Sequence, residues 1–173
     1  MKEIKYRIKY SKTGIARFTS HLDVLRALNR TVRRAGLPVA FSAGFNPKPQ
    51  LAFGPPLPLG VESESEYFDL ELTTALSEEE VAQALRQNLP SGLTVLTVHQ
   101  LAPKAPSLMA QVDSISYRFI LSPKAPWTDE QVEAWFADLW HRPELLVTKK
   151  TRAGEKRVDL KPLWQGYELS FQT

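Results

Sequence analysis

The strongest constraint on the fold is the order of amphipathic segments in the first 101 residues. Apolar and basic residues alternate over 4–10, which predicts a strand with one buried face. Ser20 and Asp23 form an S-x-x-D capping signal that begins a helix, and Gly36 ends it. The other expected elements, in order, are a strand at 39–41, a strand at 67–72, a helix after Ser77 and a strand at 93–101.

Strand, helix, strand, strand, helix, strand is the split βαβ order of a ferredoxin-like domain. After 102–112, which we interpret as a linker, the pattern begins again. It has a strand at 115–121, a helix after Thr128, a strand pair around Gly154 and a strand at 167–171. We therefore expect an α+β protein of two ferredoxin-like (βαββαβ) units, 1–101 and 113–173, the second of them incomplete. No close sequence repeat accompanies this pattern.

The chain of 173 residues contains no cysteine, which excludes disulfides and any zinc-thiolate or iron–sulfur site held by this chain alone. Its three histidines are scattered, so we expect neither a metal site nor a cofactor here. The first residues alternate like a strand and do not resemble a signal peptide. No apolar run approaches the roughly 20 residues that span a bilayer. These features predict a cytoplasmic protein with no membrane contact.

The helix that begins after Ser20 carries a dense set of arginines. Arg26, Arg30 and Arg34 follow one another at intervals of four, and Arg33 lies beside them. Guanidinium groups form bidentate hydrogen bonds with phosphate and stack on bases, so this face is suited to RNA. The alternative is a solvated helix face without a ligand. The buried stripe of the same helix is predicted at Leu22, Leu25, Leu28 (or Asn29), Val32 and Ala35.

A loop rich in glycine and proline follows the helix and carries Phe45, Asn46 and Lys48. Glycine permits positive φ and proline fixes φ, so together they specify one loop shape. Backbone amides and Lys48 could hold phosphate there, and Phe45 could stack on a base. The alternative is a structural turn with Phe45 in the core. No Walker or dinucleotide-binding glycine pattern is present.

Ser20, His21 and Asp23 do not form a catalytic triad, because neighbouring positions on one helix turn point in different directions. His21 could contact a substrate or Asp69, or be a satisfied histidine at a helix start. We expect no catalytic residue in this chain.

A second basic region is predicted around the turn at Gly154, where Lys149, Lys150 and Arg152 lie on or beside a hairpin. Such a hairpin is suited to nucleic acid. Lysine on an edge strand also prevents aggregation, which is the alternative explanation.

The blocks SHLD, RRAGLP, GFNPKP, PLPLGVES and APSLMA together resemble the radical SAM-associated domain family of bacteria, over nearly the whole chain. That family has no known function and occurs alone or fused behind a radical SAM protein. Its loop usually reads GFNPHP, and Lys48 replaces the histidine here, which argues against a metal ligand at this position. The resemblance implies a radical SAM partner that would hold the S-adenosylmethionine and the iron–sulfur cluster.

These features lead to one main hypothesis and two alternatives. The main hypothesis is a non-catalytic accessory protein that binds RNA, or a ribonucleoprotein, for a radical SAM partner, with Arg17 and His21 added to the basic residues above. The first alternative is a protein–protein adaptor that docks the radical SAM enzyme and does not contact nucleic acid. The second is a metal-independent RNA-processing enzyme with His21 as the base.

Overall fold

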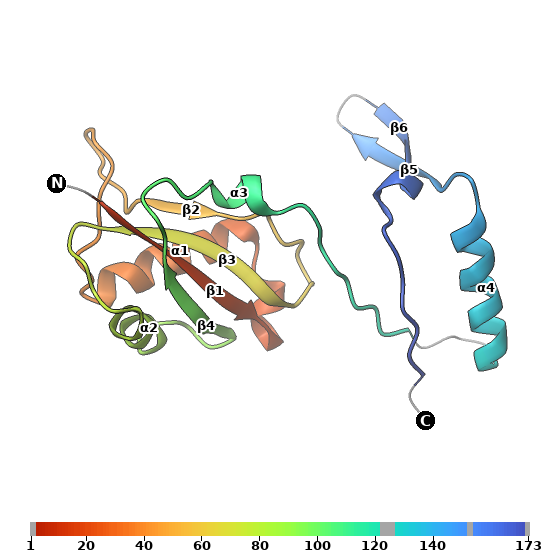
Figure 1. The fold of residues 1–173 in the computed structure, drawn as a ribbon, viewed down its shortest axis with the longest axis horizontal. Helices are drawn as coiled ribbons and strands as arrows, with labels where there is room; N and C mark the ends of the chain where they lie inside the picture. Colours follow the sequence, from red (N-terminus) through yellow and green to blue (C-terminus); the bar gives the residue numbers. More distant parts are fainter. Residues whose placement is uncertain (1–2, 122–126, 152–153, 172–173) are drawn as a thin grey trace. The chain divides into compact units, whose positions relative to one another are not determined.

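The computed structural model describes residues 3–121, 127–151 and 154–171, which form two compact units, Met1–Ser116 and Tyr117–Thr173. The first unit contains a four-stranded antiparallel sheet in the order β2-β3-β1-β4 (Figure 1). Its strands and helices are β1 (Ile4–Lys12), η1 (Gly14–Phe18), α1 (His21–Arg34), β2 (Leu51–Phe53), β3 (Ser63–Leu72), α2 (Glu78–Arg86), β4 (Leu93–Gln100) and α3 (Leu108–Gln111).

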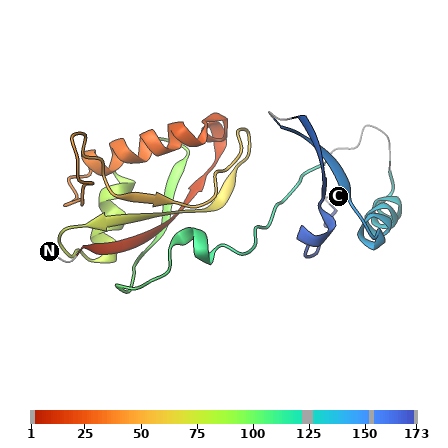
Figure 2. The ribbon, with the colours of Figure 1, turned by 90° about the horizontal axis from the view of Figure 1, so that it is seen from above.

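This connectivity and strand order are those of the ferredoxin-like βαββαβ fold, so the predicted α+β class is confirmed. Both α1 and α2 cover one face of the sheet (Figure 2). The inward-facing side chains of β1, Tyr6, Ile8 and Tyr10, are at most 4% exposed and pack in a core with both helices. The alternation of residues in β1 therefore has the predicted period.

The second strand of this unit lies later in the chain than the sequence predicts. Residues 39–41 form only isolated bridges, Val39 with Leu72 and Phe41 with Pro49. The pairing strand is β2, where Leu51 lies opposite Leu70. The prediction of a strand at 39–41 was therefore wrong. This segment leads directly into a projecting loop, so its pairing stops at single bridges.

The opposite face of the sheet carries α3, which falls within the segment 102–112. Leu108 of α3 is only 4% exposed and lies close to Gly54. Arg7 points to this face and donates a hydrogen bond to Gln111 of α3. This short helix therefore covers part of the sheet surface that α1 and α2 leave open.

The second unit contains α4 (Asp129–His141), the antiparallel pair β5 (Leu146–Thr151) and β6 (Gly154–Asp159), and η2 (Lys161–Leu163). A capping box of Thr128 and Gln131 begins α4, as predicted. Phe136 of α4 stacks on Tyr167, with ring centroids 5.6 Å apart. The helix and the strand pair are compatible with an incomplete ferredoxin-like unit.

Two further strands predicted for this region are not formed. The described residues of 115–121 and of 167–171 adopt no strand conformation. Phe119 is 76% exposed, so the alternating apolar residues of the first segment do not form a buried sheet face. Alternation of apolar and polar residues predicts which face of a strand would be buried. A strand also needs a neighbouring strand that completes its backbone hydrogen bonds.

Candidate nucleic-acid interface

The helix α1 is anchored at its start by the predicted capping box. The Ser20 hydroxyl accepts a hydrogen bond from the Asp23 backbone N–H, and the Asp23 carboxylate accepts one from the Ser20 backbone N–H. The side of α1 that faces the sheet is formed by Val24, Leu28, Thr31 and Val32. Leu22, which we predicted in this buried stripe, is 61% exposed because the true stripe is rotated toward Val24.

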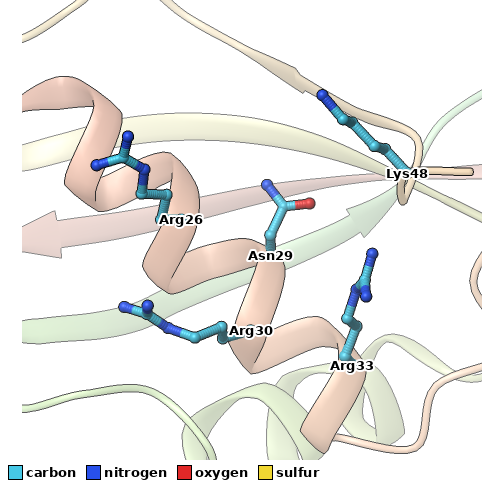
Figure 3. A pocket seen from close by; sticks show the side chains of 5 residues that line it. All are labelled: Arg26, Asn29, Arg30, Arg33 and Lys48. Carbon is cyan, nitrogen blue, oxygen red and sulfur yellow. The ribbon is translucent and has the colours of Figure 1, made fainter. Parts of the chain in front are cut away.

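The outward side of α1 forms one wall of an open hollow of about 380 Å³. Its lining consists of Arg26, Asn29, Arg30 and Arg33 from the helix and Lys48 from the loop. Figure 3 shows Asn29 and Arg33 extending on the side of α1 where Lys48 lies, with Arg26 one turn before Asn29 and Arg30 extending away from Lys48. The predicted arginine face and the predicted loop lysine therefore lie together.

Arg34 does not belong to this surface. At about 100° per residue, Arg34 lies about 40° from Arg30 around the helix axis, but it is not among the residues that line the hollow. The Arg34 guanidinium donates a hydrogen bond of 2.8 Å to the carbonyl of Asn88, in the segment after α2. Arg34 thus joins α1 to the segment after α2, and our grouping of it with Arg26 and Arg30 as one binding surface is corrected.

Lys48 is presented by residues 41–49, which we call the finger loop. The Ser42 backbone N–H donates to the Lys48 carbonyl at 2.9 Å, and the Lys48 N–H donates to the Ser42 hydroxyl at 3.1 Å. Gly44 adopts a φ of 120° near the tip, a conformation that other residues rarely take. These contacts give the finger loop a defined shape beside α1.

Positive charge in the hollow is only weakly neutralised. Arg26 forms an exposed ion pair with Asp23 at 3.3 Å. Within the described residues, no ion pair involves Arg30, Arg33 or Lys48. The pKa of Asp23 is lowered by the hydroxyl and backbone N–H of Ser20, with a smaller contribution from Arg26. The Asp23 carboxylate is thus held mainly by the helix cap, and it neutralises the hollow only through Arg26.

Aromatic side chains lie on the finger loop next to these cations. Phe45 is fully exposed near the tip, so the alternative in which it fills the core is wrong. Phe41 is 47% exposed, and the Arg33 guanidinium carbon lies 5.9 Å from its ring centroid. The exposed Asn46 follows Phe45 on the same tip. The loop therefore combines a cation, two apolar rings and an amide.

Arg17 and His21 lie outside the hollow. Arg17 is 3.5 Å from Glu62 and its guanidinium stacks on Phe18 at 4.7 Å. His21 lies edge-on to Phe53, with ring centroids 6.2 Å apart. Its suggested contact with Asp69 is not formed, because Asp69 pairs with Arg7 on the other face of the sheet.

The basic hairpin belongs to the second unit. Lys149 lies opposite Lys156, and Lys150 lies opposite Glu155, and all four residues are exposed. Arg152 lies outside the described residues.

Asn29 is the lining residue that sequence reasoning considered only for the buried stripe and not for binding. Its spacing of three from Arg26 would have identified it, but its amide gave no chemical signal in a row of arginines. The Asn29 side-chain amide donates to the Leu25 carbonyl at 2.8 Å, and its oxygen accepts no hydrogen bond within the described residues.

The fold and this surface define a ferredoxin-like α+β protein with a cationic hollow between a helix and a projecting loop. Residues 5–171 match a family described as "Uncharacterized protein conserved in bacteria (DUF2344)", and the chain therefore belongs to this bacterial family. A search of curated proteins finds no match. No helix among the described residues is long and apolar enough to cross a membrane. The same part of the chain contains no cluster of three or more histidine, aspartate or glutamate residues that could hold a metal.

Proposed function

We propose that this protein binds RNA through the hollow beside α1 and presents it, free or as a ribonucleoprotein, to a radical SAM partner. The observation that carries the proposal is that Arg26, Arg30, Arg33 and Lys48 line one hollow, and that among the described residues only Arg26 of these four forms an ion pair. Cations that line one hollow repel one another unless an anion lies between them. A phosphodiester chain supplies such anions at regular intervals.

The arginines favour phosphate over a generic anion. Their planar guanidinium groups can donate two hydrogen bonds to one phosphate, and they also stack on bases. Asn29 adds an amide oxygen that could accept from a base or a ribose hydroxyl. The mixture of cations with one neutral amide is suited to a nucleotide chain.

The radical SAM partner rests on the motif resemblance. Because the chain has no cysteine, the iron–sulfur cluster and S-adenosylmethionine would be held by the partner. This protein would contribute the positioning of the RNA and no redox chemistry.

The adaptor alternative is favoured by a separate apolar surface. Ile15, Phe18, Leu22 and Leu59 are each at least 61% exposed. Their segments are held together by hydrogen bonds from Gly60 N–H to the Arg17 carbonyl and from Gly14 N–H to the Glu62 carboxylate. A fixed apolar surface of this kind suits a protein partner. It is compatible with the RNA proposal, because it does not use the hollow.

The decisive experiment is RNA binding by the full chain over a salt series. Four phosphate contacts to a single strand predict a slope of about −2.8 for log affinity against log salt, about −0.7 for each contact. The double variant Arg26→Glu/Arg30→Glu should lose most of the affinity, and the magnitude of its slope should fall by about 1.4. Single replacement by alanine at Arg33 or Lys48 should reduce the magnitude by about 0.7.

Arg86→Glu provides the matched charge control. Arg86 lies on α2, pairs with Glu79 at 3.3 Å and does not line the hollow. If Arg86→Glu weakened binding as much as Arg30→Glu, the hollow would not be the binding site. Absence of RNA binding at low salt would overturn the proposal and leave the adaptor alternative.

The third class of function has its own readout. If RNA were cleaved by the wild type and not by His21→Ala, an RNA-processing activity would replace simple binding. His21 lies against Phe53 and does not line the hollow, so we expect His21→Ala to leave RNA affinity unchanged.

A further inference from the structure

The finger loop exposes two phenylalanine rings beside the cationic hollow, and this exposure has no role in folding. Phe45 is fully exposed, and Phe41 is 47% exposed. A phenylalanine ring left in water forgoes the stabilisation that its burial would contribute. The sequence nevertheless places these rings on a loop whose shape is fixed.

The loop is well braced at its base. A bridge joins Phe41 and Pro49, and the Gln50 N–H donates to the Ala40 carbonyl at 2.8 Å. The reciprocal hydrogen bonds of Ser42 and Lys48 close the next rung. A braced loop loses little conformational entropy when a ligand covers it, so its rings are prepared for contact.

Phe41 lies beside a cation of the hollow in space, and Phe45 lies near another along the chain. Phe45 is three residues from Lys48, and Phe41 lies 5.9 Å from the Arg33 guanidinium carbon. Both Arg33 and Lys48 line the hollow. A ligand that placed its phosphates in the hollow would therefore bring its neighbouring groups to the rings.

We propose, on the basis of the function above, that the RNA ligand is single-stranded and that unpaired bases stack on Phe41 and Phe45. In a duplex the faces of the bases are already stacked on one another, and only grooves and phosphates remain accessible. In a single strand the base faces are free, and aromatic side chains beside a cationic groove bind them with little sequence preference. Exposed rings on the loop that carries Lys48, one of them beside Arg33, therefore favour a single strand.

The test compares three probes on the full chain by fluorescence anisotropy. The first is a single-stranded oligoribonucleotide of about 12 nucleotides, within the 4–16 nucleotides that such surfaces cover. The second is the same strand annealed to its complement. The third is an abasic strand of equal length, which keeps the phosphates and lacks the bases. We expect the intact single strand to bind more tightly than both other probes.

Phe45→Ala is the informative variant, because a fully exposed side chain can be removed without loss of packing. We expect it to weaken binding of the intact single strand about fivefold or more, with the salt slope and the abasic affinity unchanged. Phe41→Ala should act in the same direction. Phe119→Ala, which removes a 76% exposed phenylalanine from the second unit, is the matched control and should bind like the wild type.

The outcomes separate this inference from the proposed function. If the abasic strand binds as tightly as the intact strand, or if Phe45→Ala has no effect, base stacking is overturned. Salt-dependent binding that is lost in Arg26→Glu/Arg30→Glu would then still support RNA binding through phosphates. If no probe binds at low salt, both proposals fail, and the exposed rings must be assigned to a protein contact.

Discussion

Arg7 and Asp69 lie directly opposite each other on β1 and β3 and form a two-point ion pair on the sheet face away from α1. The Arg7 Nε donates to Asp69 Oδ1 at 2.8 Å and a terminal nitrogen donates to Oδ2 at 2.9 Å. Their side chains are only 13% and 3% exposed. The same guanidinium also donates to Gln111, so the pair fastens α3 to the sheet.

Removal of Arg7 should therefore strongly destabilise the first unit. Arg7→Leu leaves the Asp69 carboxylate buried without a partner, and we expect a loss of about 3 kcal/mol in the free energy of unfolding. The double variant Arg7→Leu/Asp69→Leu should recover part of this loss, because no buried charge remains. Urea denaturation measures both.

Lys5→Leu is the control for this comparison. Lys5 pairs with Glu71 on the same two strands at 2.9 Å, but its side chain is 40% exposed. Its loss should cost less than about 1 kcal/mol. Equal effects of Lys5→Leu and Arg7→Leu would contradict the role of the Arg7–Asp69 pair.

Stability at alkaline pH should depend on Tyr10. Burial raises the pKa of the Tyr10 hydroxyl far above its ordinary value of 10.0, and the charge of Glu66 raises it further. Above about pH 10 the unfolded chain loses this proton while the folded protein keeps it. The folded state then binds more protons, so the free energy of unfolding must fall as pH rises.

Tyr10→Phe should remove this contribution. We expect a change within about 1 kcal/mol at pH 7 and a smaller alkaline loss than in the wild type. Nearby Lys12 has a pKa lowered by burial, which acts with the opposite sign, but it is present in both proteins and cancels in the difference. Urea unfolding from pH 7 to pH 11 measures this difference, and parallel curves would contradict it.

Gly92 should tolerate no side chain. Its φ is +86°, and a Cβ there would lie 2.6 Å from the Ala16 Cβ and 2.8 Å from the Thr13 carbonyl oxygen. Gly92→Ala should therefore cost roughly 2 kcal/mol or more, from backbone strain and from the clash together. Gly60→Ala has the same φ with no atom within 4 Å, and should cost about 1 kcal/mol from strain alone. If thermal unfolding showed the same loss of stability in both variants, the clash at residue 92 would be relieved by a local shift.

Arg34 and Arg30 should separate stability from binding. Arg34→Ala removes the hydrogen bond to the Asn88 carbonyl and should lower stability by about 1 kcal/mol, with RNA affinity unchanged. Arg30→Ala should do the reverse, because Arg30 lines the hollow and has no ion pair among the described residues. Paired measurements of unfolding and RNA affinity on both variants test this, and a loss of affinity in Arg34→Ala would restore it to the interface.

Local chemistry in the sequence determined where the helices begin and which class of fold results. Ser20, Ser77 and Thr128 each start a helix at the expected position and form a capping box there, because capping needs only residues within one turn. The alternation in β1 likewise predicted its buried face. Strand pairing was harder to predict from the sequence. The strands expected at 39–41, 115–121 and 167–171 are not formed, since a strand depends on a distant neighbour for its hydrogen bonds.

The composition of the candidate site was only partly readable from the sequence. The arginines of α1 and the residues of the finger loop were recognisable as types suited to phosphate and bases. Only the tertiary structure placed Lys48 with Arg26, Arg30 and Arg33, and only it directed Arg34 to Asn88 and Asp69 to Arg7. The physical reason is that helix periodicity orders side chains around one axis, whereas contacts between segments depend on how the sheet brings distant parts of the chain together.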